Sequence, residues 1–190
     1  MPLGAFRAAV RAHPGLGILH VDAHADLRDA YEGFEHSHAS ILFNALQLAD
    51  LGPVVQVGLR DVGTRERSLA QAEARVHWWT DDRMATAMHR GATFAELVER
   101  ILAPLPEQVW ISFDVDGLDP SLCPGTGTPV PGGLSWREAM GLLRGLGTSG
   151  RRIVGFDLCE VGPTAWDANV GARLLYKLSG WALATQREAS

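Results

Sequence analysis

The chain has 190 residues, 46% of them hydrophobic and 21% charged, which is typical of a single globular domain that can bury a core. Its 17 lysine and arginine residues against 22 aspartate and glutamate residues give a net charge of -5, which disfavours nucleic acid as a partner. The apolar runs are short and the N-terminus has an amphipathic pattern, so neither a signal sequence nor a membrane span is expected, and the predicted location is cytoplasmic. Two cysteines, Cys123 and Cys159, are too few for a disulfide framework and are expected to be reduced.

Short apolar runs alternate with segments of helical period after the N-terminal amphipathic helix. The predicted strands cover residues 17–22, 54–58, 76–79, 109–114 and 153–159. The predicted helices cover residues 39–48, 66–74, 93–102, 135–146 and 170–183, and Ser135 with Glu138 forms a capping box at the start of the fourth. This alternation predicts an α/β fold, a three-layer αβα arrangement of about five strands in a mainly parallel sheet, as one domain over residues 1–190.

Three of the predicted strands end in acidic residues, in the segments "DAHAD", "SFDVDGLDP" and "FDLCE". Ligands bind open parallel sheets beyond the carboxyl ends of the strands, where the strand order reverses. If the first three strands extend to one side and the fourth returns beside the first, the two aspartate clusters meet at that switch point. The Gly/Pro-rich residues 120–133 form a long loop inside the domain, and loops of this kind are often functional.

Five residues in the first two clusters suggest metal chemistry: Asp22, His24, Asp26, Asp114 and Asp116. Charges at the edge of a core are costly unless a cation balances them. Four carboxylates and one imidazole suit Mn(II) or Mg(II) better than structural zinc. Because four carboxylates exceed the charge of one divalent ion, we expect two ions about 3.5–4 Å apart that hold a hydroxide, as in a hydrolase. Any one of these aspartates taken alone could equally be a turn former.

Five segments in this order resemble the ureohydrolases, the arginase and agmatinase family: "HVDAHADLRD", "SHAS", "SFDVDGLDP", "PGTGTPVPGG" and "DLCEVGP". The resemblance runs from about residue 2 to residue 178. It implies an arginase-like fold and a binuclear manganese centre whose bridging hydroxide hydrolyses a guanidinium group to urea and an amine. It also implies that the five residues named above are ligands of two Mn(II) ions, with Asp22 and Asp114 as the bridging pair.

The same resemblance assigns two further residues. His38 matches the family histidine that passes a proton to the leaving amine, although a histidine before a helix can also be a solvated cap. Glu160 matches the carboxylate that binds the substrate guanidinium by charge-assisted hydrogen bonds. His36 is expected to be exposed. Asp119 is expected to shape the loop through turn chemistry; the alternative is that it orients a metal ligand without contacting the metal itself.

The expected substrate is agmatine, which would give urea and putrescine. Residues 27–37 together with "SHAS" look more like agmatinases than arginases, and the arginase pattern that holds an α-amino acid head group is absent. An arginase or a guanidinobutyrase-type ureohydrolase is the alternative. The resemblance further implies a homotrimer or homohexamer.

The chain also departs from the family pattern. Family members are longer and carry a Gly-Gly-Asp-His-Ser motif, whose histidine is a further metal ligand, and the chain begins where the segment after that motif is expected. The expectation is therefore an N-terminally truncated fold in which residues 153–159 become an edge strand and one metal lacks an imidazole. His20 is expected to pack against a helix rather than replace that ligand. An inactive or partner-dependent member, or a structural domain with solvated acidic loops, remains an alternative.

Overall fold

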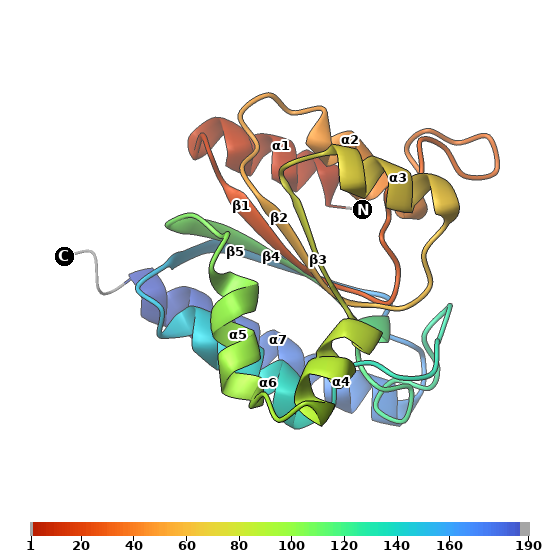
Figure 1. Cartoon of the computed structure of the whole chain (residues 1–190), viewed down its shortest axis with the longest axis vertical. Coiled ribbons are helices and arrows are strands. Elements are labelled where there is room, and N and C mark those ends of the chain that lie inside the picture. Colours follow the sequence, from red (N-terminus) through yellow and green to blue (C-terminus); the bar gives the residue numbers. More distant parts are fainter. Residues whose placement is uncertain (1, 187–190) are drawn as a thin grey trace.

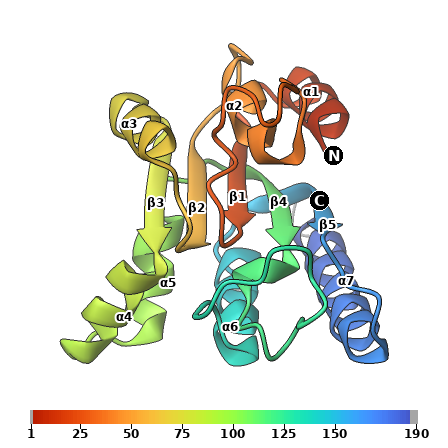
Figure 2. The same cartoon turned by 90° about the vertical axis from the view of Figure 1, so that its right-hand side faces the viewer.

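The computed structural model describes residues 2–186, and its five strands form a single parallel sheet. The strands are β1 (Gly17–Val21), β2 (Val54–Leu59), β3 (Val76–Thr80), β4 (Gln108–Asp114) and β5 (Arg152–Cys159). Their order across the sheet is β3-β2-β1-β4-β5, and every neighbouring pair is parallel (Figure 2). The strand order therefore reverses between β1 and β4, and the predicted switch point is confirmed.

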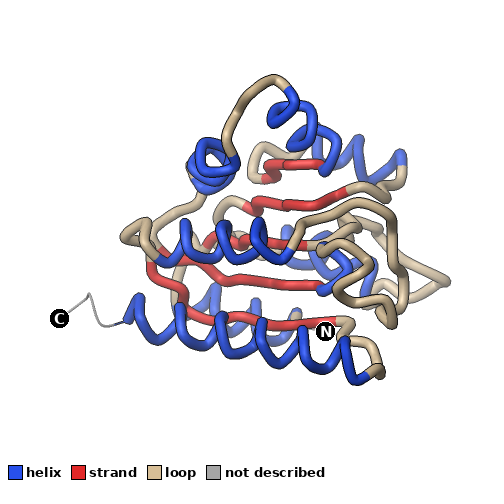
Figure 3. Tube along the Cα trace, turned by 90° about the horizontal axis from the view of Figure 1, so that it is seen from below, coloured by secondary structure: helices blue, strands red, loops and turns tan. Residues whose placement is uncertain are grey.

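Helices cover both faces of the sheet (Figure 1). One face carries α1 (Leu3–Ala12), α2 (Ile41–Leu46) and α3 (Thr64–Ala72). The other carries α4 (Asp81–His89), α5 (Phe94–Leu102), α6 (Trp136–Gly147) and α7 (Ala165–Gln186). The expected three-layer αβα arrangement is thus confirmed. Figure 3, seen from the side of α5, α6 and α7, shows the long loops gathered at one end of the sheet.

Strand alternation divides the core into two parts. Leu19 and Val21 of β1 pack toward α4–α7, whereas Ile18 packs toward α1 and α2. All residues of β1 and β2 are buried because helices cover both faces, and such strands read as nearly continuous apolar runs. The polar residues of these strands, His20 and Gln56, must therefore find partners inside the protein.

Helix α4 is the element that the sequence analysis missed. Its sequence, DDRMATAMH, has Met84, Ala87 and Met88 at helical spacing; Met84 is buried, and Ala87 and Met88 pack against the core. The start signal was present: the Thr80 side chain accepts a hydrogen bond from the Arg83 amide, and Asp81 and Asp82 lie in the first turn. The predicted helix at residues 39–48 is shorter than expected, since it begins with the 3-10 turn His38–Ser40 before α2.

β5 is an edge strand within the described part of the chain, as expected from the family resemblance. Among residues 2–186 it pairs with β4 alone, and most of its residues are only half-buried. An exposed edge of this kind can pair with another chain. None of the helices between residues 2 and 186 combines the length and apolarity that a bilayer crossing requires.

Arg60, just after β2, ties the long loop before α6 to the sheet. Its guanidinium donates hydrogen bonds to the backbone carbonyls of Gly58, Asp116, Leu118, Val130 and Pro131. Arg60→Met leaves these carbonyls without their donor, so we expect the free energy of unfolding in urea to fall by about 2–4 kcal/mol. The control is Arg67→Met, at an exposed position of α3, which should change it by no more than about 0.5 kcal/mol. Equal losses in both variants would show that the loop does not depend on Arg60.

Candidate metal centre

The adjacent carboxyl ends of β1 and β4 bring their acidic residues together. Asp22 follows β1 directly and is only 3% exposed. Its Oδ1 accepts a hydrogen bond from the His24 amide at 2.6 Å, and its Oδ2 lies 3.1 Å from His20 Nε2. Asp114 is the last residue of β4, and its Oδ1 accepts from the Asp116 amide at 3.0 Å. Backbone donors thus hold both carboxylates at the switch point.

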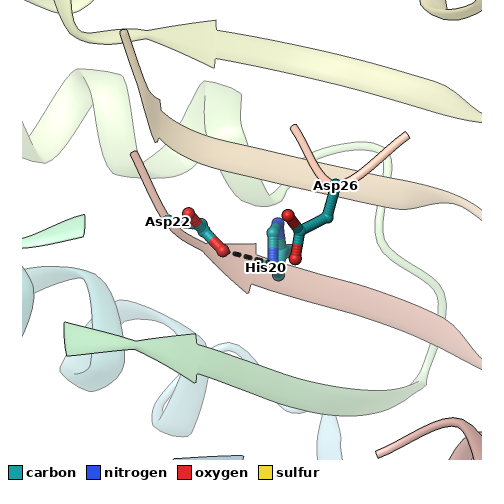
Figure 4. Close-up of side chains that lie close together, drawn as sticks. All are labelled: His20, Asp22 and Asp26. Atoms are coloured by element: carbon teal, nitrogen blue, oxygen red, sulfur yellow. Dashed lines mark ion pairs between the residues drawn. The ribbon is translucent and has the colours of Figure 1, made fainter. Parts of the chain in front are cut away.

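Two groups of side chains have the spacing of metal ligands. In the first, ligand atoms of His20, Asp22 and Asp26 all lie within 4.8 Å of one another (Figure 4). The second group consists of Asp22, His24 and Asp116. Asp22 belongs to both groups, so its carboxylate lies near the other candidate ligands of each.

His24 lies between two carboxylates. Its Nδ1 is 3.0 Å from Asp116 Oδ2 and 3.3 Å from Asp22 Oδ1. Hydrogen bonds with Asp116 and Asp22 raise the pKa of His24 to about 10, against the effect of burial. Asp116 also accepts a hydrogen bond from the Ala23 amide at 3.0 Å. A proton on His24 therefore balances these carboxylates when no other cation does.

The remaining carboxylates also show an excess of negative charge. Burial would raise the pKa of Asp22, but His20 and His24 hold it well below its usual range, so Asp22 stays ionised. Burial and the charge of Asp22 raise the pKa of Asp26 to about 8. Burial, Asp22 and Asp116 raise the pKa of Asp114 to about 9. Raised carboxylate pKa values mean that the site has more negative charge than its neighbours balance. Divalent cations can balance this charge, so the donor set fits hard metal ions.

The centre opens into a pocket of about 420 Å³. Six of the seven residues predicted from the sequence line it: Asp22, His24, Asp26, His38, Asp114 and Glu160. The seventh, Asp116, is buried and contacts His24. A smaller cavity of about 190 Å³ also contacts Asp22, Asp26 and Asp114, and reaches His20 and Cys159. The larger cavity of about 580 Å³ between α5 and α6 contains none of the predicted site residues in its lining.

Backbone strain is concentrated at two of these residues. Asp26 has φ = 53° and Glu160 has φ = 58°, in the left-handed region that favours glycine. Such conformations cost on the order of 1–3 kcal/mol and are often found at functional sites. The loop backbone approaches Glu160 closely, since a Cβ on Gly127 would lie 3.1 Å from Glu160 Oε2. The fold therefore directs the Glu160 carboxylate toward the pocket at an energetic cost.

His38 lines the pocket from the turn His38–Ser40 and is exposed. The Tyr31 ring contacts the His38 ring edge-to-face, with centroids 5.4 Å apart. His36 is exposed, as predicted, and does not line the pocket. Asp119 shapes the loop, as predicted, because its Oδ1 accepts hydrogen bonds from the amide and the hydroxyl of Ser121.

The prediction for His20 needs correction. It is buried, but its Nε2 faces Asp22 at 3.1 Å instead of merely packing against a helix. The signal was available in the sequence, because residues two apart on a strand share one face, which places His20 beside Asp22. Thr128 was also missed: it lines the pocket, and its hydroxyl lies 3.4 Å from Asp116 Oδ2.

The two cysteines form no disulfide with each other. Burial raises the pKa of Cys123 to about 11 and that of Cys159 to about 12. Both are therefore neutral thiols near neutral pH, and the thiolate is the reactive form of cysteine. This supports the expectation of reduced thiols that serve in packing.

The comparisons with known proteins agree with this geometry. A family model described as the arginase family matches residues 1–180. A guanidinobutyrase of Pseudomonas aeruginosa is 34% identical over 183 residues, which cover 90% of this chain and 54% of that protein. An agmatinase of Halalkalibacterium halodurans is 35% identical over 158 residues, which cover 83% of this chain and 51% of that protein.

The solved structures give the same result. The proclavaminate amidinohydrolase of Streptomyces clavuligerus superimposes with a TM-score of 0.80 at 28% identity, over 96% of this chain and 60% of that one. The chain spans about half the length of the curated relatives it matches. The fold, the switch-point carboxylates and the family match over residues 1–180 lead to one conclusion: this chain belongs to the arginase family.

Proposed function

We propose that this protein hydrolyses the guanidino group of a small linear substrate to urea and an amine at a centre of two Mn(II) ions. The observation that carries the proposal is that Asp22, His24, Asp26 and Asp114 line one pocket with Glu160, and that Asp116 contacts His24. The proposed ligands are the residues predicted from the sequence: Asp22, His24, Asp26, Asp114 and Asp116. Asp22 and Asp114 both line the pocket and would hold the ions together with the other three residues.

Two divalent ions at this site would lower the pKa of a water molecule toward neutrality and so supply the nucleophile. The side chains of the protein provide the remaining functions. The Glu160 carboxylate accepts hydrogen bonds from the guanidinium N–H groups and orients the planar carbon toward the aspartates. His38, exposed at the pocket, donates a proton to the nitrogen of the departing amine.

The rim of the pocket favours a cationic substrate tail. Arg28 lies 4.0 Å from Glu66 and stacks on Tyr31, so its charge already has partners. The side chain of Asp61 lines the same pocket and is 71% exposed. An exposed carboxylate at the rim suits the amine of agmatine better than the carboxylate of 4-guanidinobutyrate. We therefore propose agmatine as the substrate, in a cytoplasmic homo-oligomer as the family resemblance implies.

The test is urea release by the purified protein with Mn(II). We expect agmatine to give a higher kcat/KM than 4-guanidinobutyrate or arginine. Asp61→Asn should raise KM for agmatine by up to about fivefold, the range expected for one exposed ion pair, and should not raise KM for 4-guanidinobutyrate. Mn(II) affinity is measured in parallel, because Asp61 also lies 3.9 Å from His24. Tight Mn(II) binding without urea from any of the three compounds would contradict the proposed reaction.

A further inference from the structure

A row of polar side chains crosses the sheet two residues before Asp22 and Asp114. It runs through all five strands in one register: Trp78, Gln56, His20, Ser112 and Asp157. Gln56, His20 and Ser112 are almost completely buried. Buried polar groups need hydrogen-bond partners, so the direction of each hydrogen bond in this row is constrained.

The Gln56 amide has only one orientation that satisfies its neighbours. The Trp78 indole, which can only donate, gives its Nε1–H to Gln56 Oε1 at 2.8 Å. Gln56 Nε2 donates to the Ala25 carbonyl at 2.8 Å and lies 3.1 Å from His20 Nδ1. Since the amide nitrogen has no lone pair to offer, His20 Nδ1 must accept this hydrogen bond.

That acceptance fixes the tautomer of His20. A neutral imidazole that accepts at Nδ1 carries its proton on Nε2, which lies 3.1 Å from Asp22 Oδ2 (Figure 4). His20 therefore donates to Asp22. Spacing alone would also allow His20 to bind an ion with Asp22 and Asp26. Metal binding at Nε2, however, would require the loss of the Nε2 proton. Because Nδ1 accepts the hydrogen bond from Gln56, neither ring nitrogen would then carry a proton.

We infer that His20 is a positioning residue for the metal centre and not a metal ligand. Trp78 orients Gln56, Gln56 sets the tautomer of His20, and His20 holds Asp22 through one N–H. The inference rests on the proposed metal centre. Because ligand atoms of Asp22 lie within 4.8 Å of those of Asp26 and of those of His24 and Asp116, its orientation affects every ion that these residues would hold. Hydrogen-bond partners of ligands typically change metal affinity by about 10- to 100-fold when they are removed.

The tautomer can be observed directly by NMR of the full chain labelled with ¹⁵N-histidine. Two-bond ¹H–¹⁵N correlations are recorded without metal and with Zn(II), which is diamagnetic, and His20→Gln assigns the resonance. We expect a single proton on Nε2 of His20 in both states. A proton on Nδ1, a doubly protonated ring, or loss of the Nε2 proton on Zn(II) addition would overturn the inference.

Mn(II) affinity separates positioning from ligation. His20→Leu removes the N–H, and we expect it to weaken Mn(II) binding by about 10- to 100-fold. In His20→Gln the amide nitrogen takes the place of Nε2 and can donate to Asp22, so most of the affinity should return. If His20 were instead a metal ligand, His20→Gln would lose the ligand nitrogen and would not restore Mn(II) binding. Equal weakening in His20→Leu and His20→Gln would therefore contradict the inference.

Ser112→Ala is the matched control within the same row. It removes the hydrogen bond from Ser112 Oγ to Asp157 Oδ1, 2.9 Å long, and makes no change at Asp22. We expect its Mn(II) affinity to stay within about twofold of wild type, and a loss as large as that of His20→Leu would refute a specific role for His20. If the wild-type protein bound no Mn(II), the proposed function would fail, whereas the tautomer measured without metal would still test the His20 assignment.

Discussion

Asp114→Asn is expected to lower Mn(II)-dependent urea release by more than about 100-fold. Removal of a residue that only supports a ligand typically costs 10- to 100-fold, and loss of a ligand carboxylate should cost more. The Asn side chain keeps the size of Asp114 but has no charge and only one oxygen. We expect the weaker of two Mn(II) binding steps to be lost in a calorimetric titration, together with activity.

Asp119→Asn is the control for this prediction. Asp114 is the last residue of β4, and Asp119 lies in the loop that follows. Asp119 does not line the pocket, and its carboxylate accepts hydrogen bonds from Ser121. Its replacement should leave urea release within about threefold of wild type, since surface substitutions away from a site have small effects. Full activity in Asp114→Asn would exclude Asp114 as a metal ligand and with it the proposed centre.

The metal-free protein is expected to become less stable as the pH rises from about 5 to 9. Burial and neighbouring charges raise the pKa of Asp26 to about 8 and that of Asp114 to about 9, from a usual value of 3.8. The folded protein therefore binds more protons than the unfolded chain in this range, and the free energy of unfolding falls as the pH rises. His24, whose pKa hydrogen bonds raise to about 10, adds to the same trend above pH 6.5.

Mn(II) should reverse this trend. Metal ligands must be deprotonated, so the metal displaces these protons and binds more tightly at higher pH. Thermal unfolding at pH 5.5, 7 and 8.5, with EDTA or with Mn(II), measures both effects. We expect Tm to fall with pH in EDTA and the Tm increase on Mn(II) addition to grow with pH. A Tm in EDTA that rises steadily to pH 8.5 would mean that these carboxylates are not buried together.

Much of the fold could be predicted because its elements are local. All five strands were predicted to within two residues, since helices on both faces make β1 and β2 continuous apolar runs. Helix α4 was missed although Met84, Ala87 and Met88 have helical spacing, because it follows β3 directly and no loop residues separate the two elements. The switch point between β1 and β4 followed from the acidic residues at two strand ends, combined with the general rule for parallel sheets.

The sequence by itself determined which chemical groups are available: carboxylates at the ends of β1 and β4, a histidine between them, and Glu160 after β5. These follow from short motifs whose residues are close in the chain. Only the tertiary structure decided the role of His20, because that role depends on partners from other strands. Gln56 and Trp78 lie 36 and 58 residues from His20 in the chain, and sheet register alone brings the three side chains together. Hydrogen-bond direction is a property of such contacts in space, and no periodicity within one strand encodes it.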